Sequence, residues 1–563
     1  MPAGAGMAHL PATLVAAGIT ALVFLGAAAA ITIEGTDGPD RLVGTPAADT
    51  LAGLAGGDRI EGLGGSDFLD GGPGRDVLLG GGGPDRVAAD GDGSKDTVRC
   101  GAGTDTVTAD LSDAIAADCE TISRQLSRDP FAGFEGQHET EVEPDSFAFG
   151  SAIVTVFQVG RFGDFGGAAV NGFSASRDGG NTWRSGLLPS LTFQSAPPGP
   201  YERASDPVVA YDAKHGFWLA ASIVLGGAGT SVVVSRSRDG LVWGTPLVAV
   251  DTGPESPDKE WVACDNWPRS PFRGSCYLAY YDLVRDSIAV RFSRDGGATW
   301  SQPAVTGAGP IRQAIVNGAQ PVVRPDGSVV VLYSVFEADQ VGVDEIGAVR
   351  SVDGGATFGA PARVAALFNE DVTGLRAPPF VSAEVAGDGT IWAAWSDCRF
   401  RIDCDANDIV LVRSRDGLRW TTPVAVPADQ ADLSLAHVVP GLGVDPTSSG
   451  TKTRLGIVFY SLPSAGGCGF ALCSAADAVF VGSLNAGRTW SRPVKLTTQP
   501  MPLDWTAEGG IGSFLGDYLS TSWIAGRPVA VFSVASPPVL DERRQAIFAA
   551  TQIIGFPAAR RAR

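Results

Sequence analysis

The stretch "SRDGGNTW" (176–183) recurs along this chain and decides how its larger part folds. The first residues of its six copies lie 61, 56, 58, 63 and 69 positions apart, so a structural unit of roughly sixty residues repeats. The later copies are SRDGLVW (237–243), SRDGGATW (293–300), SVDGGATF (351–358), SRDGLRW (414–420) and SLNAGRTW (483–490).

Each copy is expected to form a hairpin turn between two strands. An apolar run such as "SVVV" (231–234) precedes a copy, and a proline-bearing run such as "SQPAV" (301–305) follows one. Ser and Asp side chains bond the amides of the turn, glycine takes a positive φ, and the indole packs on the sheet. The motif resembles the Asp box, or BNR repeat, of sialidase-like β-propellers. That resemblance implies a structural role at the outer hairpin of each blade.

A second series of strand pairs gives the number of blades. Pairs such as "DPVVAYDAKHGFWLAAS" (206–222) precede the boxes, and a seventh pair (514–535) follows the last box. We predict an all-β fold whose main domain, 140–557, is a β-propeller of seven blades. A strand before Glu143 is expected to complete the last blade, because an open ring leaves an exposed strand edge. Six blades, the number in sialidases proper, is the alternative.

An acidic segment near the N-terminus repeats every nine residues. From Gly35 the chain divides into copies such as GLGGSDFLD (62–70), with Asp in the sixth place and an apolar residue in the eighth. After an eleven-residue interruption two further aspartates continue the pattern. The repeated aspartates are Asp40, Asp49, Asp58, Asp67, Asp76, Asp85, Asp96 and Asp105.

These copies resemble the RTX nonapeptide repeat, G-G-x-G-x-D-x-U-x, which forms a calcium-binding parallel β-roll. We therefore predict a β-roll at 31–110, with the eight aspartates as Ca²⁺ ligands and Ca²⁺ as the cofactor. Carboxylate and carbonyl oxygens suit this cation, and stacked carboxylates repel one another without it, so folding is expected to depend on calcium. A flexible linker rich in glycine and aspartate is the alternative.

The charge of the chain restricts its partners. The net charge is -20, and 31–120 alone contributes -12 from 15 Asp, 3 Glu, 5 Arg and 1 Lys. Nucleic acid and anionic membrane surfaces are repelled by such a chain and are excluded as partners. We expect a polar linker and closing segment at 111–139, and a solvated basic tail at 558–563.

Export is expected from the N-terminus and from the cysteines. An apolar run (14–30) ends in small residues, which predicts a signal peptide at 1–30 and a secreted protein. A membrane anchor at the cell surface is the alternative if this segment stays uncleaved. The eight cysteines form local couples that predict disulfides, whereas zinc is disfavoured because no couple has CxxC spacing. The couples are Cys100 with Cys119, Cys264 with Cys276, Cys398 with Cys404, and Cys468 with Cys473.

Candidate binding residues lie on the first strand of each blade, because these strands line the central channel and ligands bind at its mouth. Many are acidic, and for any one of them a hydrogen bond to water or backbone is a commoner role than catalysis. The candidates are Glu143, Arg203, Asp206, Lys259, Glu260, Asp265, Gln320, Arg376, Glu384, Asp517 and Tyr518.

The resemblance to sialidases implies a catalytic set. Such enzymes use three arginines that grip the substrate carboxylate, an acid, and a tyrosine activated by a glutamate. Tyr518 in "GDYLST" stands where the family tyrosine is expected, but "EVEPD" replaces the family's F/Y-R-I-P motif. Two carboxylate pairs, Glu260 with Asp265 and Asp206 with Asp517, are candidates for a glycosidase of another type if they lie across the channel. The predicted catalytic residues are Tyr518, Glu260, Asp206, Arg161, Arg203 and Arg376.

Two functions follow as hypotheses. The first is a secreted, calcium-binding, sialidase-like propeller that recognises and hydrolyses extracellular glycans or glycoproteins. The second is a non-catalytic extracellular module that binds a glycan or a protein, favoured by the missing arginine motif.

Overall fold

The computed structural model describes residues 14–15, 29–131, 136–164, 166–227, 229–253, 255–306, 314–337, 344–428, 435–463, 475–539 and 542–556. Most of the predicted leader 1–30, and all of the basic tail 558–563, lie outside these ranges. Within them, no helix has the length and apolar character needed to cross a membrane. The chain forms two compact units, one of 1–125 with 496–499 and 552–554, and one of the remaining residues.

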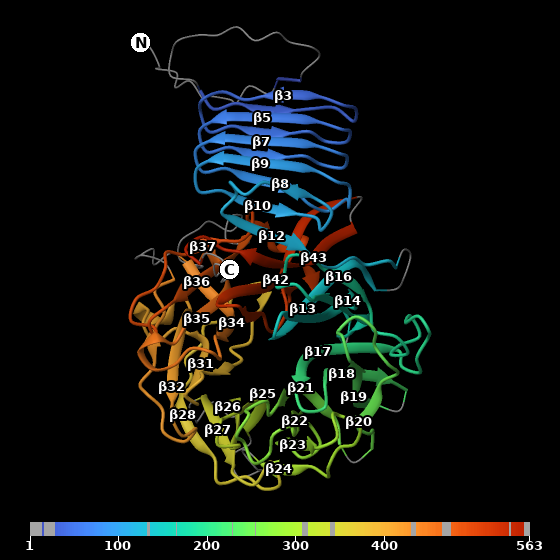
Figure 1. Ribbon diagram of the computed structural model, residues 1–563, viewed down its shortest axis with the longest axis vertical. Helices are drawn as coiled ribbons and strands as arrows, with labels where there is room; N and C mark the ends of the chain where they lie inside the picture. The colour runs from blue at the N-terminus through green and yellow to red at the C-terminus, as the bar shows by residue number, and fades with distance from the viewer. Residues whose placement is uncertain are drawn as a thin grey trace, which may run out of the picture. The chain divides into compact units, whose positions relative to one another are not determined.

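The first unit is a parallel β-solenoid, whose stacked strands Figure 1 shows in blue. One sheet contains β3 (Arg41–Val43), β5 (Arg59–Gly64), β7 (Val77–Gly82), β9 (Thr97–Ala102) and β11 (Ala114–Ile115). The other contains β2 (Thr32–Glu34), β4 (Thr50–Ala52), β6 (Phe68–Asp70), β8 (Arg86–Ala89), β10 (Thr106–Ala109) and β12 (Thr121–Gln125), and the short β1 (Leu14–Val15) pairs with β2.

Two nine-residue copies make one coil of the solenoid. Arg41 pairs with Arg59, and Arg59 pairs with Val77, so equivalent residues stack one coil apart. The eighth-place residues of the copies fill the interior and are at most 2% exposed: Leu42, Leu51, Ile60, Leu69, Leu78 and Val87. The Cys100–Cys119 disulfide also lies in this core. The predicted β-roll is confirmed, and the flexible-linker alternative is wrong.

The second unit is a β-propeller of antiparallel meanders around a central axis (Figure 1). The first two meanders are β13 (Gln137–Phe149), β14 (Ala152–Arg161), β15 (Ala168–Ser176), β16 (Arg184–Leu187), and β17 (Arg203–Asp212), β18 (Phe217–Gly226), β19 (Gly229–Ser237), β20 (Leu247–Val250). The next two are β21 (Pro257–Cys264), β22 (Cys276–Asp282), β23 (Ser287–Ser293), β24 (Ala304–Thr306), and β25 (Ala314–Val323), β26 (Val329–Glu337), β27 (Glu345–Ser351), β28 (Ala362–Ala366).

The rest of the propeller follows the same plan. Two further meanders are β30 (Ser382–Val385), β31 (Ile391–Asp397), β32 (Asp408–Ser414), β33 (Val424–Ala425), and β34 (Leu435–Val444), β35 (Leu455–Pro463), β36 (Ala475–Ser483), β37 (Val494–Lys495). The last strands are β41 (Ser520–Ile524), β42 (Arg527–Val539) and β43 (Glu542–Gln552). Short strands lie outside the meanders: β29 (Leu375–Arg376), β38 (Met501–Pro502), β39 (Ala507–Glu508) and β40 (Ser513–Phe514).

The number of blades differs from the prediction of seven, with six as the alternative. Ala168 of β15 pairs with Ala204 of β17, and Thr140 of β13 pairs with Gln545 of β43, so β13–β20 and β41–β43 make one continuous sheet. Four separate sheets follow, at β21–β24, β25–β28, β30–β33 and β34–β37. Counted as continuous sheets, the described propeller has five blades. The period of the sequence reflects the number of meanders. It does not reveal the backbone pairs that join neighbouring meanders into one sheet.

Residues before Glu143 close the ring. The amide of Leu126 donates to the carbonyl of Ile547 at 2.7 Å, and the amide of Ile547 donates to the Ser127 hydroxyl at 2.7 Å. Early and late parts of the propeller sequence are therefore bonded to each other at β43.

The Asp boxes form the predicted turns. In the third box, Asp295 Oδ1 accepts from the Ser293 hydroxyl at 2.8 Å and from two backbone amides at 3.0 Å, and Oδ2 accepts from the Thr299 hydroxyl at 2.7 Å. Gly296 and Gly297 have φ of 70° and 77°. The box lies between β23 and β24, at the outer edge of its sheet. Its role is that of a turn.

Disulfides join two of the predicted couples within the propeller. Cys264 and Cys276 link β21 to β22, and Cys398 is bonded to Cys404. The predicted couple Cys468 and Cys473 lies outside the described residues.

Candidate acid–base site in the propeller channel

Three charged residues occupy equivalent bulges on three innermost strands. The strand register shifts between Val142 and Asp145 in β13, between Ser205 and Val208 in β17, and between Asp258 and Trp261 in β21. The residues inside the shifts are left-handed: φ is 54° at Glu143, 46° at Asp206 and 49° at Lys259. Such a conformation costs a non-glycine residue on the order of 1–3 kcal/mol and persists where the surroundings fix it.

Glu143 and Asp206 meet at the ammonium of Lys259. The lysine is buried, with 8% of the residue exposed. Its Nζ donates to Glu143 Oε1 at 3.0 Å and to Asp206 Oδ1 at 2.7 Å. It also lies 2.6 Å from Oδ2 of Asp517, which precedes β41. An ammonium has three donors, so these carboxylates use all of them.

Two arginines extend this cluster. Arg376 of β29 binds Asp517 with two parallel bonds, Nε to Oδ1 at 2.9 Å and Nη2 to Oδ2. Arg161 Nη1 donates to Gln158 Oε1 at 2.8 Å, and the Gln158 amide donates to Glu143 Oε2. Both guanidinium groups stack on the ring of Phe514, at 3.9 Å for Arg161 and 5.0 Å for Arg376.

We call this set the channel cluster, defined as Glu143, Arg161, Asp206, Lys259, Arg376 and Asp517. Its charges separate the pKa values of its carboxyl groups. Burial, with the charges of Asp206 and Asp517, raises the pKa of Glu143 to about 8 against the pull of Lys259. Burial also opposes ionisation of Asp517, but Lys259 and Arg376 outweigh it and hold the pKa of that carboxyl well below its usual range. At neutral pH Glu143 keeps its proton and Asp517 is ionised.

The ammonium stays charged. Burial disfavours the charged form of Lys259, but Asp206, Asp517 and Glu143 outweigh it and raise the pKa of the lysine. The protonated carboxyl of Glu143 and the ionised carboxyl of Asp517 therefore contact the same cation, the ammonium of Lys259. Pairs whose pKa values are driven apart are typical of acid–base sites.

Arg203 lies beside the cluster and contacts none of its acids in the described residues. Its Nη1 donates to the carbonyls of Asp164 at 2.7 Å and Gly166 at 3.1 Å, and its guanidinium stacks on Phe162 at 3.8 Å. Arg161 is close by, since a Cβ built on Gly166 would lie 3.8 Å from its Nη2. Of the three predicted arginines, Arg161 and Arg376 are thus part of the cluster and Arg203 is a neighbour.

The hydroxyl of Tyr518 is bonded to the backbone and not to an acid. It donates to the carbonyl of Pro207 at 3.0 Å, and the ring packs against Trp261 at 5.3 Å. Burial, with the nearby carboxylates, raises the pKa of Tyr518 well above its usual range. The phenol is neutral and its proton is engaged by the backbone.

Glu260 is the remaining predicted acid. It is 1% exposed, and neither carboxylate oxygen has a hydrogen-bond partner among the described residues. Burial, with the charge of Asp206, raises its pKa well above the usual value. Glu260 lies next to a small cavity of ≈ 30 Å³ that Lys259 and Tyr518 also line.

Sequence reasoning places Glu143, Lys259 and Asp517 on the channel but not in the catalytic set, and it overlooks Gln158 and Phe514. One signal was available. Glu143 and Asp206 each precede a proline, as "EP" and "DP", at equivalent points of two inner strands. No such signal marks Lys259, whose partners come from three distant parts of the chain.

The solenoid aspartates form a ladder from coil to coil. Asp67 Oδ1 accepts the amide of Asp49 at 2.8 Å, and Asp85 Oδ1 accepts the amide of Asp67 at 3.0 Å. The second oxygen, Oδ2, is buried without a hydrogen-bond partner in the described residues at Asp58, Asp67, Asp76, Asp85 and Asp105.

Calcium fits the spaces beside these oxygens. A Cβ built on Gly80 would lie 2.5 Å from Asp85 Oδ2 and 2.6 Å from the Cys100 carbonyl. Glycine thus leaves a small space between a carboxylate and a carbonyl of the next coil, and both are hard oxygen ligands. Among the described residues no three His, Cys, Asp or Glu side chains are grouped to hold a metal, so carbonyls would supply part of the coordination.

Comparison with known proteins supports this interpretation of the solenoid. Residues 34–67 and 52–87 match the family described as RTX calcium-binding nonapeptide repeat. No curated protein matches the chain significantly.

Several solved structures are similar to the chain. A protein of unknown function from Dyadobacter fermentans is 19% identical, over 61% of this chain and 94% of that one, with a TM-score of 0.40. An ulvan lyase of polysaccharide lyase family PL25 is 10% identical, over 75% and 96%, with a TM-score of 0.44. A leech intramolecular trans-sialidase is 13% identical, over 59% and 67%, with a TM-score of 0.37. These similarities are too low to bear on activity. The chain consists of a solenoid of RTX calcium-binding nonapeptide repeats followed by an Asp-box β-propeller.

Proposed function

We propose that this protein is an extracellular, calcium-binding glycan hydrolase that cleaves a glycosidic bond next to an acidic sugar at the channel cluster. One observation carries the proposal: Glu143, Asp206 and Asp517 converge on the ammonium of Lys259. The shifts agree with it, because burial raises the pKa of Glu143 to about 8 while Lys259 and Arg376 hold the pKa of Asp517 below its usual range. Hydrolysis of a glycoside needs one carboxylic acid and one carboxylate across the scissile bond.

Glu143 is the proposed general acid and Asp206 the proposed second carboxylate. Glu143 gives its proton to the leaving glycosidic oxygen. Both groups bind the Lys259 ammonium, at 3.0 Å and 2.7 Å, so the two bonded oxygens lie no more than 5.7 Å apart, the sum of these distances. Retaining glycosidases hold their carboxyl groups about 5–5.5 Å apart, and inverting ones about 6.5–9.5 Å. We therefore expect retention of configuration, with Asp206 as the nucleophile.

The arginines supply the preference for an acidic sugar. Arg161 is 3% exposed, and its Nε has no hydrogen-bond partner among the described residues. Arg376 stacks on the same ring, Phe514, so two guanidinium groups flank one side of the cluster. A substrate carboxylate is a natural acceptor for such donors, and sialic acid is the acidic sugar that the resemblance to sialidases favours.

An extracellular location agrees with the calcium-binding repeats and with the disulfides of the described residues, because disulfides persist in the oxidising conditions outside the cell and extracellular modules bind calcium there. Secretion through cleavage of a leader at 1–30 is part of the proposal.

The test is release of sugar from sialylated, uronate-containing and neutral oligosaccharides, with the anomer of the first product followed by NMR. We expect release from an acidic substrate, retention of configuration, and a loss of at least about a hundredfold in kcat in Glu143→Gln. Tyr518→Phe is expected to stay active, because the hydroxyl faces Pro207. Absence of release from all three classes, or full activity in Glu143→Gln, overturns the proposal.

A second candidate, a non-catalytic glycan-binding module, is favoured by one observation. Glu143, Asp206, Asp517 and Lys259 are all paired within the chain, and the phenol of Tyr518 is bonded to the backbone. Glycan binding without release, equal in the wild type and in Glu143→Gln, would select this candidate.

A further inference from the structure

The propeller channel contains a second cavity, separate from the channel cluster. Its volume is ≈ 340 Å³. The innermost strands β13, β17, β21, β25, β30, β34 and β41 all line it, with residues that follow the bulges of β13 and β21. Neither Glu143, Lys259 nor Asp517 belongs to its wall.

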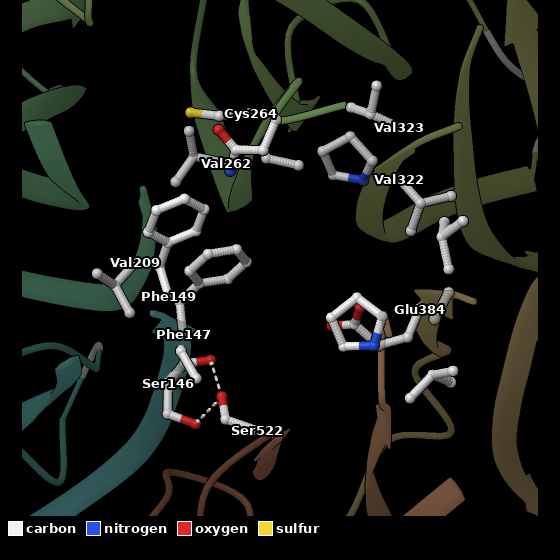
Figure 2. A pocket seen from close by; sticks show the side chains of 18 of the residues that line it. Ser146, Phe147, Phe149, Val209, Val262, Cys264, Val322, Val323, Glu384 and Ser522 are labelled. Atoms are coloured by element: carbon white, nitrogen blue, oxygen red, sulfur yellow. Dashed lines mark hydrogen bonds between the residues drawn. The ribbon is translucent and has the colours of Figure 1, made fainter. Parts of the chain in front are cut away.

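The wall of this cavity is apolar, aromatic and acidic. Five aromatic side chains line it: Phe147, Phe149, Trp261, Trp267 and Trp523. The charged groups of the wall are two acids, Asp145 and Glu384, and all the lining residues are described; none is a lysine, an arginine or a histidine. Figure 2 shows the rings of Phe147 and Phe149 and the side chain of Glu384 on opposite sides of one open space.

Burial raises the pKa values of both acids. Asp145 Oδ2 accepts the amide of Val209 at 2.8 Å, and burial raises the pKa of Asp145 to about 7. Burial, with the charge of Asp145, raises the pKa of Glu384 to about 8. A carboxylate in such surroundings is unfavourable without a counter-charge, and this wall supplies none. A cation in the cavity would replace the proton of Glu384.

We propose that this cavity binds an organic cation that consists of an ammonium group on an apolar body. Glu384 pairs with the ammonium charge, and the aromatic rings contact the hydrocarbon part. The faces of Phe and Trp rings attract such a cation, and more strongly once it has lost its water. A hydrated metal ion is disfavoured, because the apolar wall cannot replace its water ligands. An anion is disfavoured because both charged groups of the wall are acids.

The cavity makes no use of the channel cluster, so this site is independent of the proposed hydrolysis. It is also formed by the ring as a whole, because its wall comes from seven innermost strands, β13, β17, β21, β25, β30, β34 and β41. An occupant would contact early and late parts of the propeller sequence together, and would stabilise the closed ring by mass action.

The test uses phenyltrimethylammonium and its uncharged analogue tert-butylbenzene with the full chain, followed by tryptophan fluorescence or ligand-observed NMR. The charge of the first probe does not change with pH, so any pH dependence belongs to the protein. Asp145 and Glu384 are the only titratable groups of the wall, and both lose a proton as pH rises. We expect binding of the cation to tighten about tenfold or more between pH 6.5 and 9, and the uncharged analogue to bind more weakly without a pH effect.

Variants assign the effect to Glu384. Glu384→Gln should weaken cation binding at pH 9 about tenfold or more and flatten its pH dependence, while Glu370→Gln, an exposed acid outside the cavity, should change neither. Phe149 is 41% exposed at the cavity, so Phe149→Leu gives a second variant that leaves the core intact, and it should also weaken binding. Glu143→Gln should leave binding unchanged.

The proposal is overturned if tert-butylbenzene binds as tightly as the cation at pH 9, or if the wild type binds neither probe. It is equally overturned if Glu384→Gln, shown to be folded by circular dichroism, keeps the affinity and the pH dependence of the wild type. Loss of glycan hydrolysis in Glu143→Gln without any change in cation binding would separate this site from the proposed active site.

Discussion

The ammonium of Lys259 lies 2.6 Å from Oδ2 of Asp517. The first residue belongs to β21 and the second precedes β41, so this ion pair links the middle of the propeller sequence to its end. Glu143 and Asp206 bind the same ammonium from β13 and β17. Four parts of the ring thus depend on one buried cation.

Removal of that cation should destabilise the propeller. In Lys259→Met the buried Asp206 and Asp517 lose their shared counter-charge and Glu143 loses a hydrogen-bond donor, and breaking a buried pair in this way costs about 3–5 kcal/mol. Lys495→Met is the matched control, because Lys495 pairs with Asp477 at the surface and its side chain is 62% exposed; such a pair contributes about 0–1 kcal/mol. Urea denaturation measures both, and equal losses in the two variants would contradict the role given to Lys259.

The stability of the propeller should depend on pH through Glu143. The pKa of this group rises from an ordinary 4.5 to about 8 on folding. The unfolded chain therefore releases its proton first, and the stability that Glu143 contributes is full below pH 4.5 and is lost as pH rises through about 8. The difference in unfolding free energy between the wild type and Glu143→Gln should shift against the wild type over this range. A constant difference would show that Glu143 is ionised throughout.

Substitutions of Asp295 should show whether its hydrogen-bond acceptors or its charge stabilise the Asp box. Asp295→Ala removes the acceptor of two amides and two hydroxyls and should cost about 1 kcal/mol, as loss of a helix cap does. Asp295→Asn should cost less, because Asn485 occupies the same place in the last box, where its Oδ1 accepts the amide of Thr489 at 2.9 Å and its Nδ2 donates to the Thr489 hydroxyl at 2.7 Å.

The stability that the same box contributes should fall at acid pH. The pKa of Asp295 is about 2: burial opposes ionisation, but the hydrogen bonds from Thr299, Ser293 and Ala298 outweigh it. The stability contributed by this carboxylate is present above the ordinary value of 3.8 and is lost as pH falls toward 2. Asp295→Asn should lack this acid-dependent loss. Identical pH profiles between pH 4 and 2 would disprove the assignment.

Removal of calcium should loosen the solenoid. Without the cation the aspartate oxygens Oδ2 remain buried and unpartnered, so coils 41–109 should exchange amide hydrogens faster in EDTA than in millimolar calcium. Hydrogen exchange followed by mass spectrometry on the full chain measures this by segment, with peptides from β34–β36 as the internal control. Magnesium should protect less, because it loses its water reluctantly. Equal exchange with calcium and with EDTA would argue against a calcium site.

Local patterns carry much of this fold. A nine-residue copy of the solenoid places its own Asp and its own buried apolar residue, as Asp67 and Leu69 show, so the sequence predicts the coil without knowledge of the rest. The Asp box is also local, since Ser293, Asp295 and Thr299 bond one another. The disulfides between Cys264 and Cys276 and between Cys398 and Cys404 follow for the same reason.

The candidate site depends on contacts that no local pattern contains. Lys259 meets Glu143 and Asp517 only because the ring brings β13, β21 and the approach to β41 together. Tyr518 is on the expected approach to its strand, but its hydroxyl bonds Pro207, and that depends on the bulge in β17. The blade count was wrong for a related reason, because single backbone pairs such as Ala168 with Ala204 decide where one sheet ends.

The hydrogen bonds between Leu126, Ser127 and Ile547 have a consequence for biogenesis. During translation the partners of β43 emerge long before β43 itself, so the propeller cannot complete its ring until the chain as far as Ile547 has left the ribosome. The solenoid, by contrast, pairs each coil with the one before it and can grow as the chain appears. Premature termination between Gln125 and Ile547 should therefore spare the stacked coils of the solenoid and yield an open, protease-sensitive propeller.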